Sequence, residues 1–251
     1  MWPGPIRPSP RRAAIPAPTA GRRTPARGAA SCTMRPMTVP GRTDAAALLL
    51  SLDPPAWHLR HSRAVAEIAA WLADRIAARG APVDRPLVEA AALLHDVDKI
   101  LPDHDPAGRL PHGEGSAAWL TRHGHGELAR AVAHHPVTCL VDVERFRHWA
   151  AFASREERIV AYADKRAGQR LETMAERFAS WDRRYPDAWS ADQRAAIRLR
   201  ATRLEADVCR AAGVGPTEVA RLAWTGAAFR AARSGLPARA RAPVRAGGVV
   251  A

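Results

Sequence analysis

The residues most suggestive of chemistry are the adjacent pair His95-Asp96, which ends the almost wholly apolar stretch 87–94. Burying an imidazole and a carboxylate together is costly unless a charged partner or a metal ion is present. His61 and Asp164 each fall on the apolar stripe of another predicted helix, so both can face the same interior. An isolated His-Asp pair could instead cap its helix or pair with an arginine. The prediction of a metal site therefore depends on all four side chains meeting, as ligands from separate helices do in α-helical bundles.

Two lysines stand out among the 38 basic residues, nearly all of which are arginines. Lys99 and Lys165 each follow closely on a candidate ligand. A chain that uses arginine almost everywhere suggests a specific role for a compact ammonium group at these places, such as neutralising a substrate phosphate. Chance placement is the alternative. Arg63 and Arg109 are further candidates for binding the substrate, although either could simply face solvent.

The elements that must position these residues are predicted to be helices, because apolar residues recur at helical spacing and no convincing alternating strand pattern occurs. One helix is expected from after Pro55 to Gly80, and the next, capped by Asp84, from Leu87 to about Val97. Capping boxes, Ser154 with Glu157 and Ser190 with Gln193, predict the starts of two later helices. The other helical segments are expected at residues 112–123, 127–135, 171–181 and 194–212.

The order of a histidine, a His-Asp doublet and a distant aspartate resembles the HD superfamily of metal-dependent phosphohydrolases. The segments that carry the resemblance are 61–65, 91–99 and 160–165, and it covers about residues 55–170. It implies an all-α fold, the HD-domain helical bundle, and a metal site formed by His61, His95, Asp96 and Asp164.

Two more histidines are similar to those of the HD subgroup that binds two metal ions and includes symmetrical dinucleoside tetraphosphate hydrolases. These are His112, followed by Gly113, and His135, for which His134 is a competing choice. A mixed imidazole and carboxylate set suits iron, manganese, cobalt or zinc better than magnesium, which prefers oxygen ligands. The resemblance implies a dinuclear iron or manganese site, with cobalt or zinc as alternatives.

The expected reaction is hydrolysis of a nucleotide or dinucleotide polyphosphate by metal-activated water. Asp96 would bridge the metals, Lys99 would offset phosphoryl charge, and Asp98 or Glu114 would accept a proton. The subgroup continues after its fifth ligand with a Thr-rich turn, whereas this chain has residues 136–138, Pro-Val-Thr, which puts the particular substrate in doubt. Two other hypotheses are a di-iron oxygenase of the same superfamily acting on a small polyol or phosphonate, and a helical adaptor that binds through its ends.

The net charge of +13 lies at the ends, because residues 1–43 and 227–251 contain arginine but no acidic residue. These segments are predicted to be disordered, or the first to reflect a start at Met34 or Met37, around one helical domain at 44–226. Nucleic acid is an unlikely partner beyond weak contacts with these ends. A small phosphorylated substrate is expected, and a homodimer is compatible with the sequence.

The remaining features predict an ordinary intracellular protein. Three scattered cysteines indicate no disulfide framework, and the absence of a long apolar run predicts no membrane segment, so a cytoplasmic location is expected. The other histidines are expected to be exposed, except that His58 could support His61 from one turn away. They are His58, His104, His123, His125 and His148.

Overall fold

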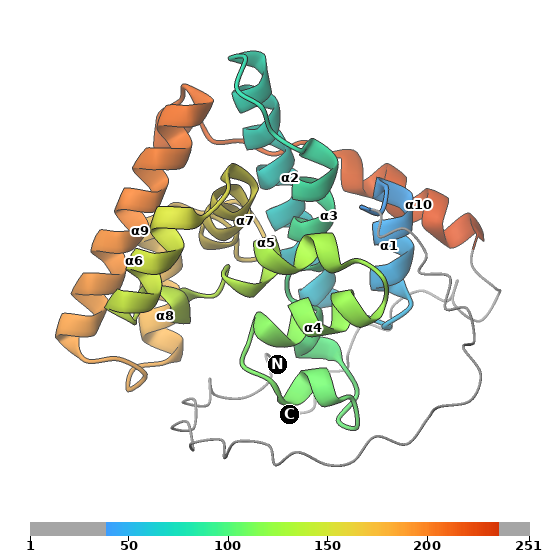
Figure 1. Ribbon diagram of the computed structural model, residues 1–251, viewed down its shortest axis with the longest axis horizontal. Coiled ribbons are helices and arrows are strands. Elements are labelled where there is room, and N and C mark those ends of the chain that lie inside the picture. The colour runs from blue at the N-terminus through green and yellow to red at the C-terminus, as the bar shows by residue number, and fades with distance from the viewer. Residues whose placement is uncertain (1–38, 236–251) are drawn as a thin grey trace, which may run out of the picture.

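The computed structural model describes residues 39–235, which form α-helices joined by short turns (Figure 1). No strand occurs within this range, where a single bridge joins Ala167 and Leu171, so the all-α prediction is confirmed. The helices are α1 Arg42–Leu50, α2 Ala56–Ala78, α3 Arg85–Leu94, α4 Glu114–Arg122, α5 Ala129–Ala133, α6 Val143–Phe152, α7 Arg155–Lys165, α8 Met174–Arg184, α9 Ala191–Ala212 and α10 Trp224–Gly235. The 3₁₀ turns are η1 Val97–Ile100, η2 Pro106–Arg109, η3 Gly126–Leu128, η4 Val137–Leu140 and η5 Pro216–Glu218.

The helix ends follow local rules that the sequence carries. Asp84 caps α3 by accepting a hydrogen bond from the Leu87 amide at 3.0 Å. The expected capping boxes open α7 and α9, and a third, Thr173 with Glu176, opens α8. These caps satisfy amides that a helix leaves unpaired in its first turn.

The core forms where α2, α3 and α7 pack together at the centre of the molecule (Figure 1). Leu72, Leu93 and Ile159 are completely buried there, one from each helix. In Figure 1, α1 and α10 lie on one side of this centre, and α6, α8 and α9 lie on the other. His61 lies on α2, Asp164 lies on α7, and His95 directly follows α3, so the same packing positions these side chains.

Several predicted boundaries were wrong by a few residues. The helix expected to reach Val97 ends at Leu94, and the chain turns into η1 directly after the His95-Asp96 pair. The segment expected to be helical from residue 112 begins at Glu114, and the one expected over 127–135 is divided between η3 and α5. These breaks arise because the candidate ligands occupy helix ends and turns, where tertiary contacts override helical periodicity.

The domain also extends further than predicted at its C-terminal end. Residues 227–235, expected to be disordered, continue α10, in which Trp224, Phe229 and Ala232 are buried. This helix packs against α1, and burial of its apolar stripe stabilises the helical conformation. A segment of Arg and Ala alone would lack this stabilisation. Residues 1–38 and 236–251 lie outside the described range, so the disorder predicted there is not tested. Between residues 39 and 235, no helix is long and apolar enough to cross a membrane.

Candidate metal centre

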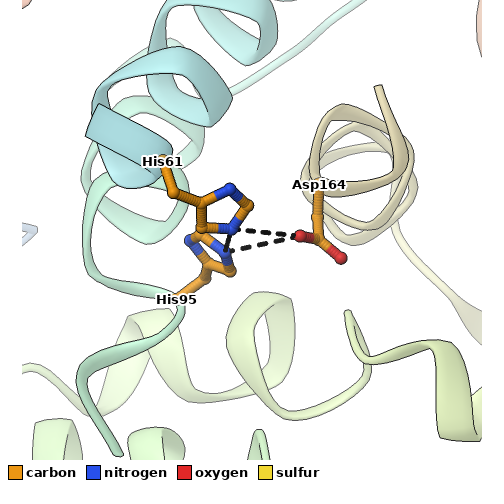
Figure 2. Close-up of side chains that lie close together, drawn as sticks. All are labelled: His61, His95 and Asp164. Carbon is orange, nitrogen blue, oxygen red and sulfur yellow. Dashed lines mark hydrogen bonds and ion pairs between the residues drawn. The ribbon is translucent and has the colours of Figure 1, made fainter. Parts of the chain in front are cut away.

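Three helices bring His61, His95 and Asp164 together in the core (Figure 2). The Nε2 atoms of His61 and His95 are 3.1 Å apart, and the His61 Nε2 atom lies 3.3 Å from Asp164 Oδ1. His95 Nε2 is 3.7 Å from the same oxygen. All three residues are buried. We call this group the inner subsite.

Asp96 joins the inner subsite to a second group of ligating atoms. Its Oδ2 atom lies 3.3 Å from His61 Nε2. Its Oδ1 atom lies 3.3 Å from the Nε2 atoms of both His112 and His135, which are themselves 3.3 Å apart. We call Asp96, His112 and His135 the outer subsite. The six residues that the sequence singled out as ligands therefore meet in one place.

The four imidazoles are oriented alike, with Nδ1 turned away from the cluster and Nε2 turned into it. Each Nδ1 lies within hydrogen-bond distance of an acceptor: Gly168 O for His61 at 2.7 Å, Ala92 O for His95 at 2.8 Å, Val132 O for His135 at 2.6 Å, and Asp98 Oδ2 for His112 at 2.9 Å. Because a carbonyl or carboxylate only accepts, each Nδ1 carries the proton and donates it. With Nδ1 protonated in this way, the Nε2 atom of each ring is the one that can bind a metal ion, as in metal-binding histidines.

The centre of this arrangement needs a cation. Asp96 Oδ1 is buried and has no hydrogen-bond partner among residues 39–235, although the Nε2 atoms of His95, His112 and His135 lie within 3.5 Å of Asp96 Oδ1. Burial would raise the pKa of Asp96, but the surrounding imidazoles and Lys99 outweigh it and hold that pKa well below its usual range. A buried carboxylate facing imidazole lone pairs is costly without a positive ion between them. The donor set fits a transition metal such as iron, manganese, cobalt or zinc.

The choice between His134 and His135 is decided by the end of α5. His135 is buried and faces the cluster, whereas the His134 side chain is 36% exposed and lies near Glu157 instead. Pro136 follows, so the chain turns here and directs the two neighbouring side chains to opposite sides. The sequence spacing left both choices open.

Asp98 has a different role from the predicted proton acceptor. Its Oδ2 atom accepts hydrogen bonds from His112 Nδ1 at 2.9 Å and from the Gly113 amide at 2.8 Å. Burial would raise the pKa of Asp98, but His112 outweighs this effect and lowers it to about 2. A carboxylate this acidic is a poor base near neutral pH, so Asp98 is better described as the residue that orients His112. The other candidate acceptor, Glu114, is exposed and pairs with Arg145 at 3.3 Å.

Gly113 allows the chain to bring His112 to the cluster. Its φ angle is +87°, and a Cβ atom there would lie 2.8 Å from the carbonyl oxygen of Ala133 and from Pro136 Cγ. Any other residue at this position would be strained, both by the positive φ angle and by the close contacts of its Cβ atom. The His-Gly pair noticed in the sequence thus has a steric reason.

The two lysines, both predicted to act on the substrate, differ sharply in burial. Lys165 is 1% exposed and donates to the carbonyl oxygens of His135 at 2.5 Å and Ala161 at 3.1 Å. These contacts give Lys165 a structural role beside Asp164, and its predicted part in catalysis and substrate binding is not tested. Lys99 donates to Asp96 Oδ2 at 2.8 Å with its side chain 23% exposed. Lys99 therefore lies at the edge of the centre, where a substrate can reach it.

Arg63, predicted to bind the substrate, makes contacts with α10, and its predicted role is not tested. Its Nε atom donates to Thr225 Oγ1 at 3.0 Å, and its guanidinium lies 5.9 Å from the Phe229 ring centroid. Two residues along a helix correspond to a rotation of about 200°, so Arg63 faces α10 while His61 faces the core. Arg109 is exposed in η2, which packs against η1 and α4; its predicted role in substrate binding is not tested.

His58 was expected to be exposed, but it is completely buried. Its Nε2 atom donates to the carbonyl oxygen of Asp96 at 3.0 Å, and its Nδ1 atom faces the Ser62 hydroxyl at 3.4 Å. Burial lowers the pKa of His58 to about 4, which keeps the ring neutral. His58 thus supports the backbone of Asp96, whereas the sequence suggested support for His61. The signal was its position one turn before His61 on the same buried stripe. Of the other histidines expected to be exposed, His104, His123 and His148 are exposed and His125 is half-buried.

Residues 59–168 match the family model described as the HD domain. All six side chains of the inner and outer subsites lie inside the matched segment. The match supports the resemblance to the HD superfamily, whose members are mostly metal-dependent hydrolases that bind divalent metal ions. Comparisons with curated proteins and with solved structures gave no match.

Proposed function

We propose that this protein is a phosphohydrolase that binds two metal ions, iron or manganese, and cleaves a phosphoester or phosphoanhydride bond of a nucleotide or dinucleotide polyphosphate. The observation that carries this proposal is the buried Asp96 Oδ1 atom, which faces imidazole nitrogens but accepts no hydrogen bond from residues 39–235. A cation between these atoms would remove the cost of burying them together.

Two metal positions explain the ligand arrangement better than one. His61, His95 and Asp164 surround the first, and His112 and His135 face the other oxygen of Asp96. The orientation of His112 by Asp98 supports a second position, because it fixes the His112 Nε2 atom toward Asp96 Oδ1. Asp96 lies between the two groups of histidines and would help to hold both ions.

Each remaining group has a role that its position allows. When bound, the metal ions lower the pKa of a water molecule to near neutrality and offset charge on the phosphoryl oxygens. Lys99, at the exposed edge, is positioned to neutralise further phosphoryl charge. His58 and Asp98 keep Asp96 and His112 in place. The same donor set would serve a di-iron oxygenase, but an ammonium group beside Asp96 favours a phosphorylated substrate.

The proposal is tested by measuring metal content and hydrolysis of bis(p-nitrophenyl) phosphate without oxygen, with added Mn²⁺. We expect turnover by the wild type. We expect loss of metal and of activity, on the order of 10³-fold or more, in the His95→Ala, Asp96→Ala variant, since each 1.36 kcal/mol of lost transition-state stabilisation is tenfold in rate.

Asp103→Ala is the matched control, because Asp103 is exposed in a nearby loop, and it should keep both metal and activity. Equal metal content in the wild type and the double variant would contradict the metal centre. Turnover of a polyol or phosphonate that requires oxygen, with no anaerobic hydrolysis, would overturn the hydrolase and support the oxygenase.

A further inference from the structure

A second feature of interest is a cavity of about 240 Å³ between the turn at residues 168–172 and helix α8. The cavity lies next to the metal centre, on the Nδ1 side of the His61 ring, because Gly168 lines the cavity and its carbonyl oxygen accepts the hydrogen bond from His61 Nδ1. Three arginines and one carboxylate line the same cavity: Arg170, Arg177, Arg184 and Glu172. Its lining is therefore predominantly cationic.

Arg177 is the unusual member of this lining. It is only 7% exposed, and its Nε atom is buried without a hydrogen-bond partner within residues 39–235. No carboxylate of the described chain lies within 4.0 Å of its guanidinium, which instead lies over the Trp181 ring, 4.5 Å from the centroid. Burial lowers the pKa of Arg177, while the charges of Asp164, Glu172 and Asp96 oppose that effect. A buried arginine without an anion is costly, so this position is suited to an anion supplied from outside.

Glu172 contributes the complementary group. Its Oε2 atom is also buried, and it has no hydrogen-bond partner in the part of the chain that is described. An unsatisfied donor and an unsatisfied acceptor thus line one cavity without bonding to each other. A ligand with an anionic group for Arg177 and a hydroxyl group for Glu172 would satisfy both.

We propose that this cavity binds the sugar-phosphate end of the substrate, with its phosphate on Arg177 and a sugar hydroxyl on Glu172. The inference rests on the proposed function and extends it, since it assigns a site for a phosphate other than the one that is cleaved. Arg170 and Arg184, both exposed, lie where they can add to the attraction. At about 240 Å³ the cavity is smaller than the roughly 300–1,000 Å³ of typical ligand sites, so it holds one end of a larger molecule.

The position of Arg177 on α8 is consistent with a role in binding. The buried face of this helix carries Phe178 and Trp181, and Arg177 lies on the same face. An arginine on the solvent-facing side would keep its hydration and would not carry the free-energy cost of burying its charge. Helix α8 also begins after residue 168, where the family match ends. The cavity is therefore formed in part by residues outside the matched segment.

The experiment is calorimetric binding of ribose 5-phosphate and of inorganic phosphate to the full-length, metal-loaded protein. Arg177→Gln is expected to weaken ribose 5-phosphate at least tenfold, which corresponds to about 1.4 kcal/mol. Glu172→Gln is expected to weaken ribose 5-phosphate but not inorganic phosphate, a difference that general damage to the fold would not produce. Arg183→Gln is the matched control, because Arg183 is exposed on the same helix and does not line the cavity.

The outcomes separate this inference from the proposed function. Binding can be measured without turnover. If the wild type hydrolyses nothing but binds ribose 5-phosphate, and Arg177→Gln weakens that binding, only the proposed hydrolase activity would be contradicted. Binding by Arg177→Gln within twofold of the wild type would overturn the cavity assignment, as would a wild type that binds no ribose 5-phosphate. If Arg177→Gln does not fold, the exposed pair Arg170→Gln, Arg184→Gln should still weaken binding about threefold, and unchanged affinity there would overturn the assignment too.

Discussion

The inner and outer subsites use similar side chains but are held in different ways. The inner subsite is formed by α2, the end of α3 and α7, and its residues are all buried in the core. The outer subsite depends on short elements: His112 precedes α4, His135 follows the five-residue α5, and the His112 side chain is 28% exposed. Core packing positions one subsite, whereas local hydrogen bonds and a glycine position the other.

This difference predicts a division of labour. A ligand that is packed into the core cannot be removed without affecting stability, since the neighbouring groups lose contacts. A ligand on a turn can be removed with less effect on the fold, but the site there loses its geometry. Among the six ligand candidates, the His112 side chain is the most exposed, at 28%, so a change at His112 should affect activity more than stability.

The largest expected effects come from two separate single substitutions, one of a histidine in the outer subsite and one of a histidine in the inner subsite. His112→Ala should leave about one metal equivalent of two and lower kcat/KM roughly 10²-fold, for about 3 kcal/mol of lost transition-state stabilisation. His61→Ala should lose metal as well, but it should also lower the free energy of unfolding, because a cavity opens and Gly168 O loses its donor. Elemental analysis and urea unfolding measure both effects. Equal destabilisation by the two substitutions would contradict the comparison.

The two lysines should show the same contrast in a smaller way. Lys165→Met removes the ammonium donor from the buried carbonyl oxygen of His135 and should lower the free energy of unfolding by about 1–3 kcal/mol. Lys99→Met should lower kcat/KM roughly tenfold, an effect not expected of Lys165→Met, although it also removes a charge partner from the completely buried Asp96. Urea unfolding and steady-state kinetics on both variants decide this. The reverse pattern would mean that Lys165 is the residue that meets the substrate.

The smallest expected effect concerns Asp98 and pH. Because the pKa of Asp98 is lowered from 3.8 to about 2 in the folded protein, its ionised form stabilises the fold at pH values above about 4. That stabilisation, about 2 kcal/mol, is lost as pH falls from about 4 to 2. The gap in unfolding free energy between the wild type and Asp98→Asn should therefore be present at pH 6 and narrow toward pH 2. A gap that stays constant over this range would show that Asp98 is not held by His112.

Much of the fold could be predicted because it depends on local rules. The caps at Asp84, Ser154 and Ser190 are hydrogen bonds within one turn, so the sequence contains both partners. The third box at Thr173 follows the same rule and could have been found in the same way. The continuation of α10 to Gly235 was missed because its stability comes from packing on α1, more than 170 residues away in the chain.

The sequence by itself determined which residue types carry the chemistry and which helix face each would occupy. His61 and Asp164 were identified because helical periodicity relates a side chain to its own apolar stripe, and the His95-Asp96 pair because buried polar groups need partners. Only the tertiary structure decided which neighbour each face meets. It directed His135 inward and His134 outward, turned Arg63 toward α10, and buried His58 and Lys165. It also left the Nε atom of Arg177 without a hydrogen-bond partner among residues 39–235. The physical reason is that periodicity fixes directions around one helix axis, whereas contacts between helices depend on how distant segments pack.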